Sequence, residues 1–476
     1  MIRTRFAPSP TGFLHIGGVR TALFSWLYAK KYKEKFLIRI EDTDYTRSTK
    51  KAVAAIIEGL SWLGLMCDGF PQYQSDNFDR YRKIMQKLLD QRKAYRCYCS
   101  TERLKTLRDN QIANKKKPRY DGYCRNLKNY SNQKLNRPHV IRFKNPEHGA
   151  IIWQDAIKGE IKITNKELDD LILWRSNDTP TYNFCVVIDD IDMEITHVIR
   201  GDDHINNTPR QINLYHALER KIPVFAHVPM ILAEDGRKLS KRHNAVSIIE
   251  YRNQGYLPQA LINYLLRLGW SHGDREILTI DEILKYFELN NINIAPAIFN
   301  IKKLNWFNQY YMRNLPLSEV IHHLKWHFNN AGLDINNGPS YNELIPVMAK
   351  KVKTLKALVK ASFYFYTEFD QYVKKAFKKY LTVETIVPIE HVVQYFEKMP
   401  DSHWQEPLIL YEILKKVAAK LGLEMRKIGM PVRVAVTSGS ESPDIGLTLK
   451  WLGKKRVILR LRRAIYAIKK NTGRKR

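Results

Sequence analysis

The first eighty residues alternate between short apolar strands and amphipathic helices. An alternating apolar run at 2–6 predicts a strand, and the apolar residues from 19 to 27 fall on one face of a helix. A second strand is predicted at 36–40 and a second helix at 50–63. This order is typical of a parallel sheet covered by helices. Ligands of such α/β folds bind beyond the carboxyl ends of the strands.

The pattern changes between about 81 and 178, where the chain is polar, lysine-rich and irregular, most strongly at 115–119. We interpret this stretch as an inserted α+β domain. Short apolar strands are predicted to resume at 184–188 and 194–199, and 228–232 leads into a basic loop. The α/β fold is therefore expected to be split by the insertion.

Beyond about residue 316 strands nearly vanish, and segments such as 352–365 and 408–423 show helical periodicity. The last segment is predicted to leave Arg460, Arg463 and Lys470 on a basic exposed side, opposite an apolar face made of Trp451, Ile458, Leu461, Ile465 and Ile468. The regions expected are the two halves of the α/β fold (1–80 and 179–245), the insertion (81–178), a helical connection (246–315) and an all-α region (316–476).

Two loops carry candidate phosphate chemistry. The first, at 8–18, is rich in proline and glycine and joins the first strand to the first helix. This geometry presents backbone N–H groups and the positive end of the helix dipole to phosphates. His15 stands just before the helix, where its ring can donate to a phosphate. The second loop, at 238–242, adds two lysines and an arginine, whose charges suit a polyphosphate that becomes more negative as pyrophosphate leaves.

A second group of residues suits a small acidic amino acid. Arg5 and Arg200 are predicted at the carboxyl ends of strands that face one cleft, and a guanidinium can bind a carboxylate through two parallel hydrogen bonds. Ser9, Glu41 and Tyr182 could surround the amine and the second carboxylate. On spacing alone, the same residues could be ordinary salt-bridge residues at strand ends.

Charge points to a polyanionic partner. The 476 residues include 79 Lys or Arg against 48 Asp or Glu, a formal net charge of +31. A generally basic proteome would explain part of the excess but not its clustering, since 450–476 holds twelve basic residues and no acidic one.

No apolar run approaches the roughly 18 residues of a membrane span, and the N-terminus does not suggest a signal peptide. Five cysteines in so long a chain favour the reducing cytoplasm over a disulfide framework.

The two loops resemble the HIGH and KMSKS signatures of class I aminoacyl-tRNA synthetases, with Gly18 at the last position of the first signature. The flanking residues narrow the resemblance to glutamyl-tRNA synthetases. Five motifs carry it in family order: R-x-A-P-S-P-T-G at 5–12, R-I-E-D-T-D at 39–44, P-T-Y at 180–182, V-I-R-G-D-D-H at 198–204 and K-L-S-K-R at 238–242.

The resemblance implies ATP-dependent ligation of L-glutamate to the 3′ end of tRNA through glutamyl-adenylate, with Mg²⁺. It implies a Rossmann-type nucleotide-binding domain, an inserted domain for the acceptor end and a helical anticodon-binding region, in a monomer that charges tRNA-Glu, tRNA-Gln or both. The implied catalytic residues are His15, Lys238 and Lys241, and the implied glutamate site is Arg5, Ser9, Glu41, Tyr182 and Arg200. The implied ATP site is Ala7, His15, Gly17, Gly18, Asp203, Lys238, Ser240, Lys241 and Arg242.

A cysteine cluster in the insertion suggests a metal. Cys97, Cys99 and Cys124 offer three thiolates, whereas a structural zinc takes four ligands. Many relatives carry His or Asp two residues after the third cysteine, where this chain has Asn126. Tyr120 matches an arrangement in which a tyrosine completes the site, so the resemblance implies zinc on these three cysteines and Tyr120. The plain alternative is three unligated thiols.

Two other functions fit parts of the pattern. A truncated relative transfers glutamate to the modified base queuosine of a tRNA, but it lacks the helical region that follows 316 here. A non-catalytic RNA-binding protein built on an inactive synthetase is the other possibility. The intact His15, Lys238 and Lys241 argue against it.

Overall fold

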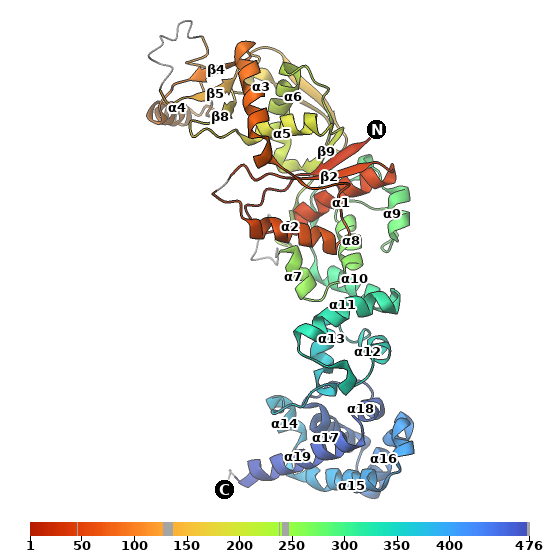
Figure 1. The fold of residues 1–476 in the computed structure, drawn as a ribbon. Helices are drawn as coiled ribbons and strands as arrows, with labels where there is room; N and C mark the ends of the chain where they lie inside the picture. The colour runs from red at the N-terminus through yellow and green to blue at the C-terminus, as the bar shows by residue number, and fades with distance from the viewer. Residues whose placement is uncertain (45, 127–136, 238, 240–246, 474–476) are drawn as a thin grey trace. The chain divides into compact units, whose positions relative to one another are not determined.

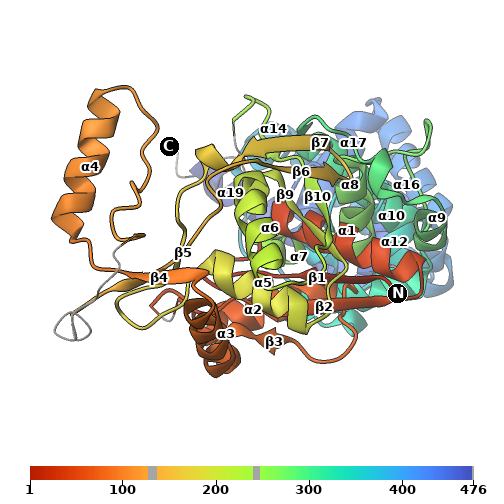
Figure 2. The same cartoon turned by 90° about the horizontal axis from the view of Figure 1, so that it is seen from above.

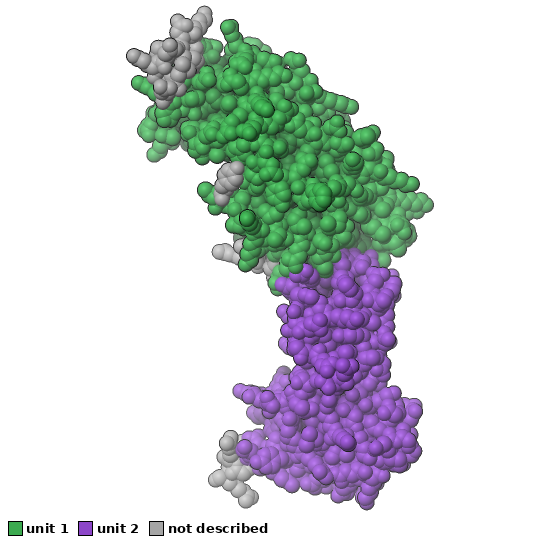
Figure 3. Space-filling model, in the orientation of Figure 1, with its two compact units in different colours: residues 1–250, 262–301 green, residues 251–261, 302–476 purple. Residues whose placement is uncertain are grey.

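The computed structural model describes residues 1–44, 46–126, 137–237, 239 and 247–473 (Figure 1). The chain divides into two compact units, each discontinuous in sequence (Figure 3). The first consists of 1–250 and 262–301, and the second of 251–261 and 302–476. Among the described residues, none of the helices combines the length and apolar character that spanning a bilayer requires.

The first unit is built on a parallel sheet. In spatial order its described strands are β10 (Val224–Val228), β9 (His197–Gly201), β1 (Arg3–Phe6), β2 (Lys35–Ile40) and β3 (Gln72–Tyr73). The central strand β1 pairs with β2 on one side, with Arg5 opposite Leu37, and with β9 on the other. The predicted α/β class is confirmed. The carboxyl ends of neighbouring parallel strands meet at one edge, so Arg5, Glu41 and Arg200 come together there.

The helices that flank this sheet follow from the sequence pattern. α1 (Ile16–Lys31) buries Val19, Leu23 and Leu27 and packs on β1 and β9. α2 (Lys50–Trp62) begins at Thr49, whose side chain accepts the N–H of Ala52 and so stabilises the first turn. The second half of the sheet is accompanied by α5 (Tyr182–Asp192), α6 (Thr208–Ala217) and the 3₁₀ helix η4 (Asp202–Asn207).

The prediction of a strand at 184–188 is wrong, because these residues lie in the middle of α5. A short continuous apolar run suits a buried helix as well as a buried strand, and every residue from Phe184 to Asp190 is buried. Glu194, with a φ of 54°, follows the end of the helix. The strand predicted at 194–199 is therefore found slightly later, as β9. The helix places Asp189 and Asp190 in the protein interior.

The insertion forms two separate β structures. β4, β5 and β8 make an antiparallel sheet, whereas β6 and β7 form a hairpin that lies beside β10 (Figure 2). Ala156 in the hairpin turn donates its N–H to the carbonyl of Phe225 in β10, at 2.8 Å. The elements are α3 (Phe78–Asp90), β4 (Ala94–Cys97), α4 (Thr101–Ala113), β5 (Val140–Phe143), β6 (Ala150–Asp155), β7 (Gly159–Thr164) and β8 (Ile172–Trp174).

The remaining elements are mostly helices. β11 (Ile231–Leu232) and β12 (Ala297–Ile298) pair in the first unit, which also contains α9 (Ile280–Tyr286), while α7 (Ile248–Asn253) and α8 (Pro258–Arg267) cross the boundaries between the units. The second unit is helical, as predicted. It contains α10 (Ile301–Asn314), α11 (Leu317–Asn330), α12 (Tyr341–Met348), α13 (Leu355–Ser362), α14 (Lys374–Tyr380), α15 (Ile386–Lys398), α16 (Pro407–Lys420), α17 (Met425–Thr437), α18 (Ile445–Leu452) and α19 (Lys454–Gly473).

Two details of the last helix differ from the prediction. Trp451 belongs to α18 and not to the final helix, since the chain turns at Gly453 with a φ of 81°. Arg460 is not on the exposed basic side but is fully buried. Its guanidinium pairs with Glu368 at 3.0 Å and donates to the backbone carbonyls of Tyr364, Val436 and Thr367. A periodicity of charge cannot reveal such tertiary acceptors.

Candidate active site

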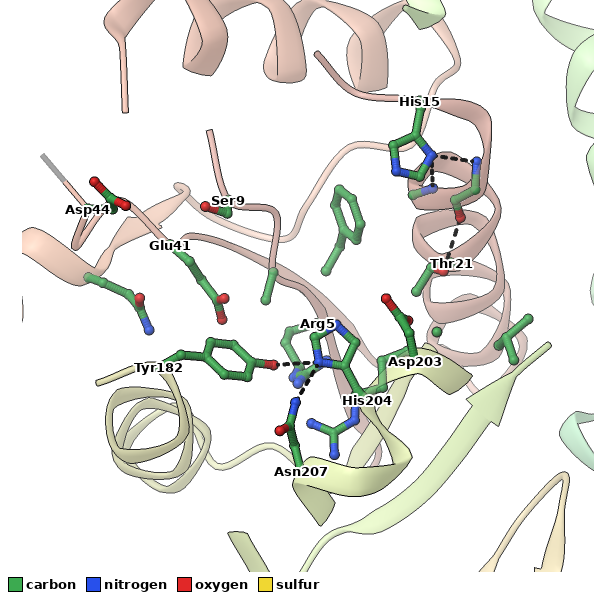
Figure 4. Close-up of a pocket in the computed structure, with 18 of the residues that line it drawn as sticks. Arg5, Ser9, His15, Thr21, Glu41, Asp44, Tyr182, Asp203, His204 and Asn207 are labelled. Carbon is green, nitrogen blue, oxygen red and sulfur yellow. Dashed lines mark hydrogen bonds between the residues drawn. The ribbon is translucent and has the colours of Figure 1, made fainter. Parts of the chain in front are cut away.

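A cavity of about 1000 Å³ opens at the carboxyl edge of the parallel sheet. The ten described residues of the predicted glutamate and ATP sites all line it: Arg5, Ala7, Ser9, His15, Gly17, Gly18, Glu41, Tyr182, Arg200 and Asp203. Figure 4 labels six of them, Arg5, Ser9, His15, Glu41, Tyr182 and Asp203. Lys238, Ser240, Lys241 and Arg242 lie outside the described residues. Leu239, which stands between them, also lines the cavity.

The amino end of α1 borders this cavity through His15. The Nδ1 of His15 accepts the backbone N–H groups of Gly17 and Gly18, at 3.1 and 3.4 Å. This nitrogen therefore bears no proton. No acidic residue occupies the first helical turn, so no side chain of that turn brings a negative charge to the positive end of the helix dipole. The arrangement suits an anion such as a phosphate.

Two of the residues that line the cavity, Arg5 and Glu41, belong to a buried network of charges. Asp190, in α5, accepts from Arg5 at 3.1 and 3.3 Å and from Arg39 at 2.6 Å. Burial disfavours the ionised form of Asp190, but Arg39 and Arg5 outweigh this and hold its pKa below the ordinary value. Arg39 also donates to Glu41 at 3.2 Å. Much of the charge of Arg5 is thus balanced inside the protein.

Glu41 and Tyr182 face each other across the cavity (Figure 4). Burial raises the pKa of Glu41 to about 6, although Arg39 and Arg5 act in the opposite direction. Burial and Glu41 raise the pKa of Tyr182 to about 12, so it stays a neutral phenol. Glu41 can therefore accept from an ammonium group, while Tyr182 has a hydroxyl to donate.

Arg200 differs from Arg5 in its partners. It is buried, with 5% exposed, and donates to three neutral groups: Nε to His227, one Nη to Gln211 and the other to Thr208, at 3.1, 2.8 and 2.8 Å. No carboxylate of the described residues forms an ion pair with it. Three of its five N–H groups are used, which leaves two for another acceptor. The charge and the two remaining N–H groups of this buried guanidinium suit a carboxylate ligand.

Two polar residues stand out among the cavity residues that the sequence analysis did not predict, His204 and Asn207. The Nδ1 of His204 is 3.2 Å from the Tyr182 hydroxyl and 3.3 Å from the Asn207 amide. Burial and Arg200 lower the pKa of His204 to about 4, so the ring is neutral. The single lone pair of Nδ1 can accept from one of these two groups at a time. His204 closes the motif that contains Arg200, and its position in that motif could have marked it. Asn207 carries no signal in the sequence.

The cysteine cluster has the geometry of a tetrahedral metal site. The Sγ atoms of Cys97, Cys99 and Cys124 lie within 4.8 Å of one another, with 3.6 Å between the last two. The Tyr120 hydroxyl is 3.3 Å from the Cys97 sulfur and 3.5 Å from the Cys99 sulfur. Zinc–sulfur bonds of about 2.3 Å in a tetrahedron imply sulfur–sulfur distances of about 3.8 Å. The three thiols and the phenol therefore fit a zinc ion.

Comparison with known families identifies the class of the protein. Residues 1–306 match the catalytic domain of class I tRNA synthetases (E and Q), and residues 319–465 match an anticodon binding domain. The chain therefore belongs to the class I tRNA synthetases of this E and Q group.

The relatives that this chain resembles over its whole length carry one activity in their names, glutamate–tRNA ligase. A glutamate–tRNA ligase of Francisella tularensis subsp. holarctica (strain LVS) is 54% identical over 98% of this chain and 99% of its own. One of Francisella philomiragia subsp. philomiragia is 53% identical over the same shares. Among solved structures, a glutamate tRNA ligase from Elizabethkingia meningosepticum in complex with its amino acid has a TM-score of 0.83 and 31% identity. That match covers 98% of this chain and 99% of the other.

Proposed function

We propose that this protein ligates L-glutamate to the 3′ end of tRNA, using ATP and passing through glutamyl-adenylate. The observation that carries the proposal is one cavity bordered by the amino end of α1 at His15 and by the Arg200 cation, which has no carboxylate partner among the described residues. A nucleoside triphosphate and an acidic amino acid require these two features close together.

The glutamate site is assigned by charge. Arg200 has no carboxylate partner in the described part of the chain and binds one substrate carboxylate, with Arg5 beside it and Tyr182 donating its hydroxyl. Glu41 accepts from the substrate ammonium group, and Ser9 lies near it on the cavity wall (Figure 4). The cavity then holds opposite charges at opposite ends of the amino acid, which fixes its orientation.

The ATP site extends from this pocket along α1. Ala7, His15, Gly17, Gly18 and Asp203 line the same cavity and bind the nucleotide. Lys238, Ser240, Lys241 and Arg242 complete the site and, with Mg²⁺ bound to ATP, balance the phosphate charge. His15, Lys238 and Lys241 act in catalysis by stabilising negative charge that grows in the transition state.

The reaction needs no covalent enzyme nucleophile. A glutamate α-carboxylate oxygen attacks the α-phosphorus as the bond to the pyrophosphate oxygen breaks. The 2′-hydroxyl of the terminal adenosine then attacks the adenylate carbonyl, losing its proton as AMP leaves. Both steps depend on positioning and on charge neutralisation.

The remaining regions contact tRNA. The insertion at 81–178 holds the acceptor end, and the helical region from 316 reads the anticodon of tRNA-Glu, tRNA-Gln or both. The match of residues 319–465 to an anticodon binding domain supports this and disfavours the shorter tRNA-modifying enzyme. We further propose a cytoplasmic monomer.

The insertion also carries a structural zinc ion. Cys97, Cys99, Cys124 and Tyr120 hold it, and Tyr120 is the oxygen ligand. The backbone N–H of Cys124 donates to the Tyr120 oxygen at 2.9 Å, which fixes that oxygen toward the three sulfurs. When bound, zinc would fasten the end of β4 to the loop that contains Cys124.

Pyrophosphate exchange tests the function directly. The full-length protein, with tRNA present, should exchange labelled pyrophosphate into ATP when L-glutamate is added, and much less when L-glutamine or L-aspartate replaces it. Aminoacylation of separately purified tRNA-Glu and tRNA-Gln then decides which is charged. Tight tRNA binding without any exchange would instead support the non-catalytic alternative.

A further inference from the structure

The buried imidazole of His227 forms a hydrogen bond with the guanidinium of Arg200. The Nε2 of His227, in β10, accepts from Arg200 Nε at 3.1 Å. On the other side of the ring, Nδ1 lies 2.5 Å from the carboxylate of Asp155, and the side chains of His227 and Asp155 are both fully buried. A ring that accepts at Nε2 and faces a carboxylate at Nδ1 carries its proton on Nδ1.

The ring is neutral in this position. Burial lowers the pKa of His227, and the nearby charge of Arg200 adds to this, which together outweigh the effect of Asp155. A protonated ring would also point an N–H at the Nε–H of Arg200. The three groups therefore form a directed chain in which carboxylate, imidazole and guanidinium polarise one another.

Asp155 is itself held by the turn of the β6–β7 hairpin. Its Oδ1 accepts the backbone N–H groups of Ile157, Lys158 and His227, at 3.1, 3.0 and 3.2 Å. The hairpin is also hydrogen-bonded to Phe225, whose ring lies 5.1 Å from the Arg200 guanidinium carbon. Asp155 therefore connects the inserted region, through His227, to the Arg200 side chain that lines the cavity.

We propose that Asp155 and His227 are a positioning pair that aims Arg200 at the substrate carboxylate and balances part of its charge. The positive charge of Arg5 is balanced by the carboxylate of Asp190, which accepts directly from its guanidinium. This direct contact occupies N–H groups that could otherwise bind a substrate carboxylate. At Arg200 the carboxylate acts through the ring, so two N–H groups stay available. The inference rests on the proposed binding of a glutamate carboxylate by Arg200.

The test is the glutamate dependence of pyrophosphate exchange by the full-length protein with tRNA. Asp155→Asn removes the charge at constant size, and His227→Gln removes the ring. Each should raise the KM for glutamate at least about tenfold, with the KM for ATP and kcat changed less than about threefold. Because the two residues act in one chain, the double variant should be no worse than His227→Gln alone.

A matched control separates positioning from stability. Asn213 is also buried, and its side-chain amide donates to Asn145 and Asn165 at 2.8 and 3.1 Å rather than to any group that holds Arg200. Asn213→Ala should lower the melting temperature and leave the glutamate KM unchanged.

Several outcomes would overturn the positioning pair: an unchanged glutamate KM in folded Asp155→Asn, additive effects in the double variant, or an equal rise in Asn213→Ala. If His227→Gln does not fold, the glutamate affinity of Asp155→Asn, measured by calorimetry, decides the question by itself. An affinity equal to that of the wild type would then overturn the proposal. Wild-type protein without glutamate-dependent exchange would overturn the proposed function instead.

Discussion

Asp190 holds Arg5 by both carboxylate oxygens, with Nε 3.1 Å from Oδ1 and Nη2 3.3 Å from Oδ2. Oδ1 also accepts from Arg39 at 2.6 Å. A single acid on α5 thus fixes side chains from two neighbouring strands, β1 and β2, and it is shielded from solvent, since Asp190 is 3% exposed.

Replacing Asp190 with asparagine should destabilise the fold. Two buried guanidinium groups would lose a shared charge, and breaking such a pair costs about 3–5 kcal/mol. Since the pKa of Asp190 lies below its ordinary 3.8, its stabilisation is present above pH 3.8 and is lost as the pH falls through the lower folded value. Urea unfolding at pH 7 measures the loss. A change under about 1 kcal/mol would mean that Asn satisfies both arginines.

Glutamate binding should weaken as the medium becomes acidic. The pKa of Glu41 is raised to about 6, so its carboxylate is ionised at pH 7.5 and mostly protonated at about pH 5.5. A protonated Glu41 cannot attract the substrate ammonium, and the KM for glutamate should rise about fourfold over this range. Glu41→Gln should have a high KM that does not vary with pH. A pH-dependent KM that survives this substitution would assign the titration to another group.

The basic loop should act mainly in the transition state. Lys241→Ala is expected to lower adenylate formation at least ~10²-fold while glutamate affinity, measured by calorimetry, changes little, because one lost contact to developing charge costs roughly 2.7–4 kcal/mol. Lys221→Ala, an exposed lysine on another loop, is the matched control. Near-normal pyrophosphate exchange in Lys241→Ala would show that the basic loop at 238–242 does not take part in adenylate formation.

Purified protein should contain about one zinc per chain without added metal. Cys99→Ser should lose it, whereas Cys67→Ser, a cysteine outside the cluster, should retain it. Tyr120→Phe tests the oxygen ligand, since it removes only the hydroxyl that lies 3.3 Å from Cys97. Metal analysis by mass spectrometry gives the stoichiometry. Full zinc content in Tyr120→Phe would exclude the tyrosine as a ligand, and none in the wild type would leave three ordinary thiols.

Exposed lysines on α19 should contribute to tRNA binding. Lys455 and Lys470 are exposed, whereas Arg462 and Lys469 on the same helix have acidic partners. Replacing both lysines with glutamate should weaken tRNA binding and reduce the slope of log affinity against log salt by about 2, close to one unit per phosphate contact. Charging of transcripts with substituted anticodons provides the specificity control. If substitution leaves charging unchanged, the helical region does not read the anticodon.

The sequence predicts those elements whose formation depends on neighbouring residues, and it fails where contacts between distant residues decide the structure. The pattern predicts β1, α1, β2 and α2 within a few residues, because apolar periodicity and turn chemistry act over neighbouring positions. It mistakes the buried helix α5 for a strand, because an apolar run without a polar face shows no period. The residues predicted to bind glutamate and ATP lie around one cavity where the structure describes them. The residues that support them, Asp190, Gln211 and His227, have no recognisable signal in the sequence. Such partners are chosen by tertiary packing.

The discontinuity of the second unit affects how the protein is made. Residues 251–261 leave the ribosome before 302–476 exist, yet Tyr256 and Leu257 are buried in the finished unit, where Asn308 accepts the N–H of Leu257 at 2.7 Å. These apolar side chains must stay exposed, or be shielded by a chaperone, while the later helices are translated. A chain that stops at residue 301 would leave this segment permanently without its packing partners and prone to aggregate.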